Sequence, residues 1–151
     1  MWSKNSSVLL SKGIIIFGFI MTVTILPFIP DFAKFYDSIS GEDPIWMSLS
    51  AVFYSTIVIV VILLITLFRL LNNISKQITF VDQNTKYLRI ISWCCFLIAG
   101  IYVIYGLIIY PAVYFSLVVG FIAGFMGLIL RILKNVFAEA VSIREENDYT
   151  V

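Results

Sequence analysis

The sequence predicts an all-α membrane protein: a bundle of four transmembrane helices, N-in/C-in, with the fourth span extended into a cytoplasmic helix. Three observations predict this class. Of the 151 residues, 61% are hydrophobic and 13% are charged, whereas soluble domains carry roughly a quarter charged residues. The uncharged residues form runs long enough to cross a bilayer. The basic residues fall almost entirely on one side of a four-span arrangement.

The first two uncharged runs, residues 13–30 and 44–68, predict spans at about residues 11–30 and 45–70. A spanning helix needs about 20 mostly apolar residues, and both runs meet that length. The first run is long for a cleaved signal peptide, and no small-residue cleavage site follows it. We therefore expect an uncleaved anchor, with signal-peptide cleavage as the alternative.

Residues 90–130 form one uncharged stretch. As a single helix it would be about 60 Å long, twice the thickness of the hydrocarbon core, so it must fold back. Pro111 is the expected turn because proline breaks a helix. The stretch predicts spans at about residues 90–110 and 113–134, followed by a cytoplasmic tail at residues 135–151. The whole chain is expected to be a single four-span membrane domain.

The basic residues set the orientation. In a four-span arrangement only Lys34 falls on one side, and the other nine fall on the opposite side: Lys4, Lys12, Arg69, Lys76, Lys86, Arg89, Arg131, Lys134 and Arg144. Cytoplasmic loops carry such an excess of basic residues. We therefore expect a multi-pass protein of the bacterial plasma membrane with both termini cytoplasmic and the acidic 31–43 loop outside. That loop is read as a short interfacial helix. A sensor patch for a cationic peptide and a weak divalent-cation site are the alternatives.

The fourth span carries small residues at helical spacing: Ser116, Gly120, Gly124 and, offset beside them, Gly127. Such residues let another helix approach closely, which is how helices associate in lipid. The strip has two interpretations, a homodimer seam or packing within one bundle, and the second is favoured.

The composition excludes several functions. The chain has no histidine, its net charge is +1, and no charged side chain lies deep in a predicted span, so a proton relay and direct nucleic-acid binding are not expected. No catalytic constellation, cofactor site or metal site is visible, and an enzyme is not expected. Serine and threonine hydroxyls within the spans are expected to bond back to their own helices. Cys94 and Cys95 are interpreted as apolar side chains that pack in the interior of the bundle, with palmitoylation as the alternative.

The inner loop, residues 71–89, has more pattern than a bare linker. Residues 78–81 are β-prone, and Asp82 is the expected N-cap of the helix that leads into the third span. Lys86 and Arg89 then lie near the anionic surface of the inner leaflet.

The tail continues the helical pattern past the membrane. Its apolar residues recur at spacings of three and four: Ile132, Leu133, Val136, Phe137, Ala140 and Val141. Acidic residues oppose the macrodipole at a helix C-terminus, so we expect the helix to end at about Glu145, with Asn147 as a left-handed cap. Residues 149–151 are β-prone and predict a short two-strand cytoplasmic patch with residues 78–80.

Two segments resemble a known family. Residues 134–140 read Lys-Asn-Val-Phe-Ala-Glu-Ala, and residues 143–151 read Ile-Arg-Glu-Glu-Asn-Asp-Tyr-Thr-Val. With Phe80, Asn84, Leu88 and Arg89 of the inner loop, they resemble a bacterial family of small four-span membrane proteins of unknown function that close on a similar Ile-Lys-Glu-Glu-Asn-Asp-Leu-Thr-Ile phrase. Tyr149 and Val151 replace the commoner aliphatic pair. The resemblance implies a partner, because such genes often sit beside one for a small Cro/CI-type helix-turn-helix regulator.

The sequence is compatible with two candidate functions. The first is a non-enzymatic membrane protein that binds or regulates a cytoplasmic partner, such as a small helix-turn-helix regulator, through its inner loop and tail. Its candidate contact residues are Phe80, Asn84, Arg89, Arg144, Glu145, Glu146, Asn147, Asp148 and Tyr149. A tail that only packs on its own bundle is the alternative for this surface. The second function is a membrane binder of a lipid, small molecule or peptide, of the immunity or export accessory type.

Overall fold

The computed structural model describes residues 4–40, 44–76, 81–109 and 112–149. Its elements are α1 (Lys4–Ile25), the 3₁₀ turn η1 (Leu26–Phe28), α2 (Ile29–Ser40), α3 (Trp46–Ser75), α4 (Asp82–Ile108) and α5 (Val113–Tyr149). Four stretches are long and apolar enough to cross a membrane: Val8–Ile39, Trp46–Ser75, Asp82–Ile108 and Val113–Arg144. No strand occurs in these described ranges. The expected all-α, four-span architecture is confirmed.

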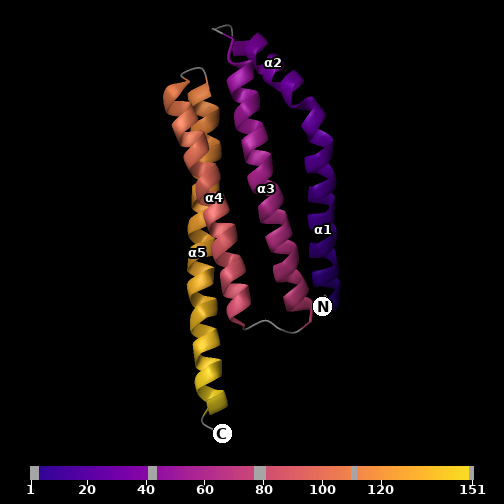
Figure 1. Ribbon diagram of the computed structural model, residues 1–151, viewed down its shortest axis with the longest axis vertical. Coiled ribbons are helices and arrows are strands. Elements are labelled where there is room, and N and C mark those ends of the chain that lie inside the picture. The colour runs from indigo at the N-terminus through magenta and orange to yellow at the C-terminus, as the bar shows by residue number, and fades with distance from the viewer. Residues whose placement is uncertain (1–3, 41–43, 77–80, 110–111, 150–151) are drawn as a thin grey trace.

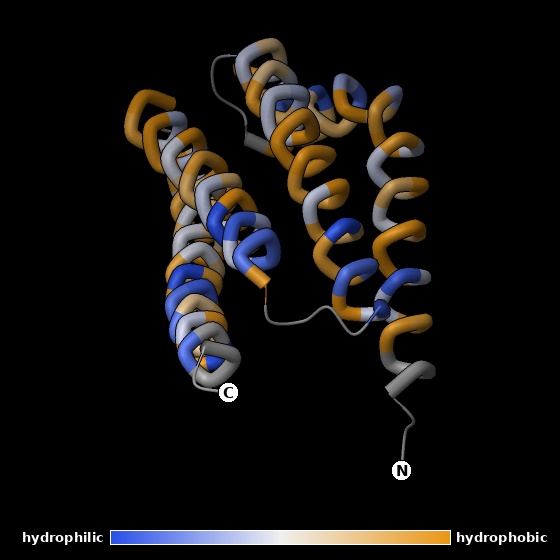
Figure 2. Tube along the Cα trace, turned by 60° about the horizontal axis from the view of Figure 1, so that its bottom comes forward, coloured by the Kyte–Doolittle hydropathy of each residue, from blue (hydrophilic) through white to orange (hydrophobic). Residues whose placement is uncertain are grey.

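The long helices lie side by side, and each packs mainly against its neighbour in chain order (Figure 1). The contact between α4 and α5 is the most extensive. The start of α1 and the end of α5 lie at the same end of the molecule, which we call the terminal end, and α2 lies at the opposite end. Hydrophilic residues gather towards the terminal end, whereas the middle of the helices is hydrophobic (Figure 2).

The first span bends before it reaches α3. Pro27 lies at the start of η1, where its missing N–H and its ring disfavour a continued α-helix. The chain resumes as α2, the short helix expected in the 31–43 loop, and α2 packs on α3. Asp37 fixes this corner, because its carboxylate accepts hydrogen bonds from the backbone N–H groups of Ile45 (2.9 Å) and Trp46 (3.0 Å). The Asp37 carboxylate thus satisfies free donors where α3 begins.

The interior is small, as expected of helices that face lipid. One buried cluster at the α2 end contains Ala33, Ile45, Leu49, Tyr105 and Ala112. A second, near the terminal end, contains Leu70, Leu88 and Ile91, with Phe137 of α5 packed against it. Many large apolar side chains point outward along the helices, as in Phe121, which is 74% exposed. A water-soluble monomer rarely exposes so continuous an apolar surface.

Three details of the expected secondary structure are wrong. The N-cap of α4 is Val81, whose carbonyl accepts the Asn84 N–H at 3.0 Å. Asp82 instead occupies the first helical turn, where its charge still favours the helix dipole. The second error is the end of α5, which continues through Asn147 to Tyr149 rather than ending near Glu145. The third is the expected strand at Tyr149, which is helical. Unfavourable charges at a helix end cost only about 0.3–1 kcal/mol each, too little to stop a long helix.

Other expectations fall outside the described residues. Residues 78–80, Thr150 and Val151 of the two-strand patch lie there, as does Pro111 of the expected turn. The chain nevertheless reverses between Ile108 and Val113, since α4 and α5 pack side by side along their length.

Candidate functional site

The small residues of α5 face α4 of the same chain. A Cβ atom placed on Gly120 would lie 2.9 Å from Val103 Cγ2 and 3.3 Å from the Ala99 carbonyl oxygen. One placed on Gly124 would be at an ordinary 3.6 Å from Ala99 Cβ. The absence of side chains at these positions therefore sets how closely the two helices approach.

The same seam continues towards both ends of the pair. Ser116 is fully buried and lies opposite Gly106, where an added Cβ would come within 2.8 Å of Ser116 Cβ. At the other end, a Cβ on Gly127 would meet the Phe96 ring at 3.2 Å and Cys95 Cβ at 3.3 Å. The geometry favours packing within one bundle over a homodimer seam, because all four small residues face α4 of the same chain.

Hydroxyl groups within the spans mostly bond to their own helix. Six of the expected side chains do so, each donating to the carbonyl four residues earlier: Thr22, Thr24, Ser50, Ser55, Thr56 and Thr66. Ser92 is the exception, because its hydroxyl donates across to the Gly127 carbonyl of α5 at 2.8 Å. This buried hydrogen bond requires the close approach that Gly127 permits.

Asn84, a candidate contact residue, is buried and belongs to the interior. Its side chain is 0% exposed, and its Oδ1 atom accepts a hydrogen bond from Asn73 Nδ2 at 2.9 Å. Nearby, Lys12 Nζ donates to Asn72 Oδ1 at 3.2 Å. These polar side chains tie α1, α3 and α4 together at the terminal end. Asn84 therefore does not lie at a surface that a partner can reach, and its interpretation as a contact residue is wrong.

Replacement of Asn84 by alanine is expected to lower the free energy of unfolding by about 1–3 kcal/mol, because the partly buried Asn73 amide would lose its acceptor. Thermal unfolding of the detergent-solubilised protein measures this effect. Asn135→Ala, at an exposed position of α5, is the matched control and should change little. Equal stability of the two variants would contradict the structural role of Asn84.

The apolar stripe of the tail divides into two faces. Phe137 packs on the cluster of α3 and α4, and Val141 is only 5% exposed. On the opposite face, Ile132, Val136 and Ile143 are 63%, 56% and 54% exposed. We call these three residues the exposed strip. Part of the tail thus packs on its own bundle, and part presents apolar side chains outward.

The structure describes the side chains of three of the remaining candidate contact residues. Arg89, Arg144 and Glu146 are exposed. Phe80 lies outside the described residues, and so do the side chains of Glu145, Asn147, Asp148 and Tyr149, whose backbone belongs to α5.

A basic pocket lies between α4 and α5 near the terminal end. It has a volume of about 260 Å³ and is lined by Arg89, Ser92, Trp93, Arg131 and Lys134. The sequence places Arg89 at the membrane surface, but it does not show that Arg89 faces Arg131 and Lys134. That pairing depends on the register of the α4–α5 seam.

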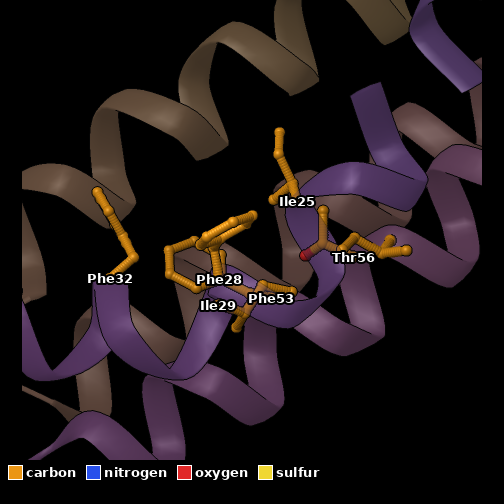
Figure 3. A pocket seen from close by; sticks show the side chains of 7 residues that line it. Ile25, Phe28, Ile29, Phe32, Phe53 and Thr56 are labelled. Carbon is orange, nitrogen blue, oxygen red and sulfur yellow. The ribbon is translucent and has the colours of Figure 1, made fainter. Parts of the chain in front are cut away.

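A second, apolar groove lies where α1 bends into α2. It has a volume of about 410 Å³ and is lined by Ile25, Phe28, Ile29, Phe32, Phe53, Thr56 and Ile57. Figure 3 shows these side chains coming from the bend and from α3. Because the Thr56 hydroxyl already donates to the Val52 carbonyl at 2.8 Å, the lining offers little except hydrocarbon contact.

The described residues show no constellation for catalysis. They contain no group of three or more histidine, cysteine, aspartate or glutamate side chains that could hold a metal ion. Cys94 and Cys95 are both buried free thiols on α4, packed in the bundle rather than presented at its surface.

Four long apolar helices and an outward-facing apolar surface define a multi-pass membrane protein. A family model described as "Protein of unknown function (DUF2975)" matches residues 28–151. The chain belongs to this family, and the match includes both the inner loop and the tail. No curated protein and no solved structure matches the chain.

Proposed function

We propose that this protein is a non-enzymatic protein of the bacterial plasma membrane that binds a soluble cytoplasmic protein through the extension of α5. The observation that carries the proposal is the exposed strip, Ile132, Val136 and Ile143. It lies beyond Leu130, the last residue of the uncharged stretch. The excess of basic residues supports a cytoplasmic location for this end and for both termini.

The length of α5 supports a position outside the hydrocarbon for Val136 and Ile143, which follow the predicted span 113–134, whereas Ile132 lies at the edge of that span. The helix has 37 residues, which at 1.5 Å per residue give about 55 Å, against a core about 30 Å thick. About 25 Å of helix therefore continues past the membrane. Large aliphatic side chains held in water are unfavourable, and aliphatic side chains that share one face of a helix suit the apolar groove of a partner.

The charge beside the strip indicates the kind of partner. Residues 145–148 read Glu-Glu-Asn-Asp and place three carboxylates at the end of the helix. DNA-binding proteins carry basic surfaces that phosphates normally occupy. An acidic helix end next to an apolar strip suits such a protein, and the family resemblance favours a small helix-turn-helix regulator. Binding at the membrane would hold the regulator away from DNA, with no direct contact between this chain and nucleic acid.

Site-specific photo-crosslinking in living cells tests this proposal. A photoreactive phenylalanine analogue at Val136 is expected to capture a small helix-turn-helix protein, identified by mass spectrometry. The same analogue at Phe125, on the same face of α5 but within the uncharged stretch, is the control and should capture lipid. An adduct at position 136 consisting only of lipid or of a second copy of this chain would contradict the proposal, the second copy indicating a homodimer.

A second candidate function is binding of an apolar molecule, either a lipid tail, a small molecule or an apolar peptide segment. The groove at the α1–α2 bend favours it, because its lining matches a hydrocarbon chain. The same photoreactive analogue, placed at Phe32 in the lining of the groove, tests this second function. A single defined adduct there would support the ligand-binding function, whereas the bulk-lipid adducts expected at Phe125 would count against it.

A further inference from the structure

We infer that the basic pocket between α4 and α5 binds the phosphate of an anionic phospholipid. The inference is independent of any protein partner. It rests on the convergence of three cations, the rigid floor of the pocket, and its depth along the helices.

Two helical faces bring the cations together. Arg89, Ser92 and Trp93 lie three and four residues apart on α4, so they share one face. Arg131 and Lys134 are three residues apart on α5 and share the face opposite. Two guanidinium groups and one ammonium group thus line one volume of about 260 Å³, which suits a phosphate with several oxygen acceptors.

The floor of the pocket fixes this arrangement. The Ser92 hydroxyl donates to the Gly127 carbonyl at 2.8 Å and holds α4 against α5 directly beside the cations. Trp93 packs edge-to-face on Phe96, with ring centroids 6.2 Å apart and planes at 71°. Because the Ser92 hydrogen bond joins α4 to α5 within the chain, the backbone positions that carry the cations are held side by side before any anion binds.

Among the side chains that the structure describes, the cations have no neutralising partner: no described carboxylate forms an ion pair with Arg89, Arg131 or Lys134. Three like charges around one small volume repel one another. An anion that enters the pocket relieves this repulsion and forms charge-assisted hydrogen bonds.

The depth of the pocket indicates a lipid rather than a soluble phosphate. Arg89 and Arg131 are the charged residues that border the uncharged stretch 90–130 on its two sides. The pocket therefore lies at the level of the headgroups. Trp93 lies one turn further into the stretch and is 56% exposed, the position that tryptophan favours at a membrane interface. A phospholipid fits with its phosphate among the cations and its acyl chains beside Trp93.

Native mass spectrometry of the full-length protein in detergent tests the inference with phosphatidylglycerol and phosphatidylcholine as probes. Wild-type protein is expected to retain phosphatidylglycerol and not phosphatidylcholine. Each cation near an anionic lipid contributes about fivefold to affinity, so R89Q/R131Q is expected to bind phosphatidylglycerol about 25-fold more weakly. R69Q/K76Q is the matched control, because it removes two exposed cations at the C-terminal end of α3, outside the pocket, and should bind as the wild type does.

A melting-temperature comparison and a competition with soluble glycerol phosphate complement the binding measurement. The melting temperature in phosphatidylcholine should be at least as high for R89Q/R131Q as for the wild type, because the variant lacks the repulsion among the cations, and added phosphatidylglycerol should raise the melting temperature more for the wild type. Soluble glycerol phosphate at millimolar concentration should not displace the lipid. The inference is overturned if R69Q/K76Q loses as much affinity as R89Q/R131Q, if neither double variant loses any, or if glycerol phosphate competes as well as phosphatidylglycerol. None of these results depends on the protein partner.

Discussion

Replacement of Gly120 by alanine is expected to lower the free energy of unfolding by about 2 kcal/mol, and replacement by valine by about 3 kcal/mol. The added Cβ would lie 2.9 Å from Val103 Cγ2 and 3.3 Å from the Ala99 carbonyl oxygen. Val103 is β-branched and stiff, and the carbonyl belongs to the backbone of α4, so neither moves easily. The helices must therefore separate along the most extensive contact of the fold.

Gly100→Ala is the matched control for this effect. No atom lies within 4 Å of the Cβ that it would add. Alanine in a helix is favoured over glycine by roughly 0.5–1 kcal/mol in water, so the control is expected to be neutral or stabilising. Thermal unfolding in a fixed detergent compares the two. If Gly120→Ala were as stable as Gly100→Ala, the described α4–α5 seam would be incorrect.

The double variant V136S/I143S is expected to bind the proposed regulator about 100-fold more weakly than the wild type does. Both side chains belong to the exposed strip, and the loss of two central apolar anchors costs roughly 1–2 kcal/mol each, with 1.4 kcal/mol equal to tenfold in affinity. Because neither side chain is buried within the protein, its stability should not change. Titration of the solubilised variant with the purified regulator measures the affinity.

Val141→Ala is the control on the opposite face of the same helix. Val141 is 5% exposed, so its truncation is expected to lower stability by about 1–2 kcal/mol and to leave the affinity unchanged. V136S/I143S should thus lower the affinity for the regulator without lowering stability, and Val141→Ala should lower stability without lowering the affinity. A V136S/I143S protein that binds normally would show that the exposed strip is not the contact surface.

The sequence predicts the number of the spans well because membrane insertion depends on composition over about 20 residues. At the α2 end of the molecule, the predicted spans coincide with the ends of α3, α4 and α5 to within about two residues, whereas at the terminal end all three helices continue beyond the uncharged runs. The bend at η1 is less visible, since Pro27 lies inside an apolar run that hydropathy alone treats as continuous. The end of α5 is mispredicted because its acidic residues oppose the helix only weakly.

The functional surface is harder to predict, because it depends on which residues meet across helices. Asn84 looks like a surface residue of a polar loop, yet its partner is Asn73, eleven residues away on α3. The tail stripe appears as a single apolar face, but packing on α3 and α4 occupies only the side with Phe137. The basic pocket joins Arg89 to residues more than forty positions later. Each of these depends on helix register, which hydropathy does not specify.

Co-purification of the full-length solubilised protein with the proposed small helix-turn-helix regulator is the most direct test of the proposed function. The proposal predicts that wild-type protein retains the regulator and that retention falls when residues 142–151 are removed or when V136S/I143S is introduced. Failure of the wild-type protein to retain the regulator would contradict it.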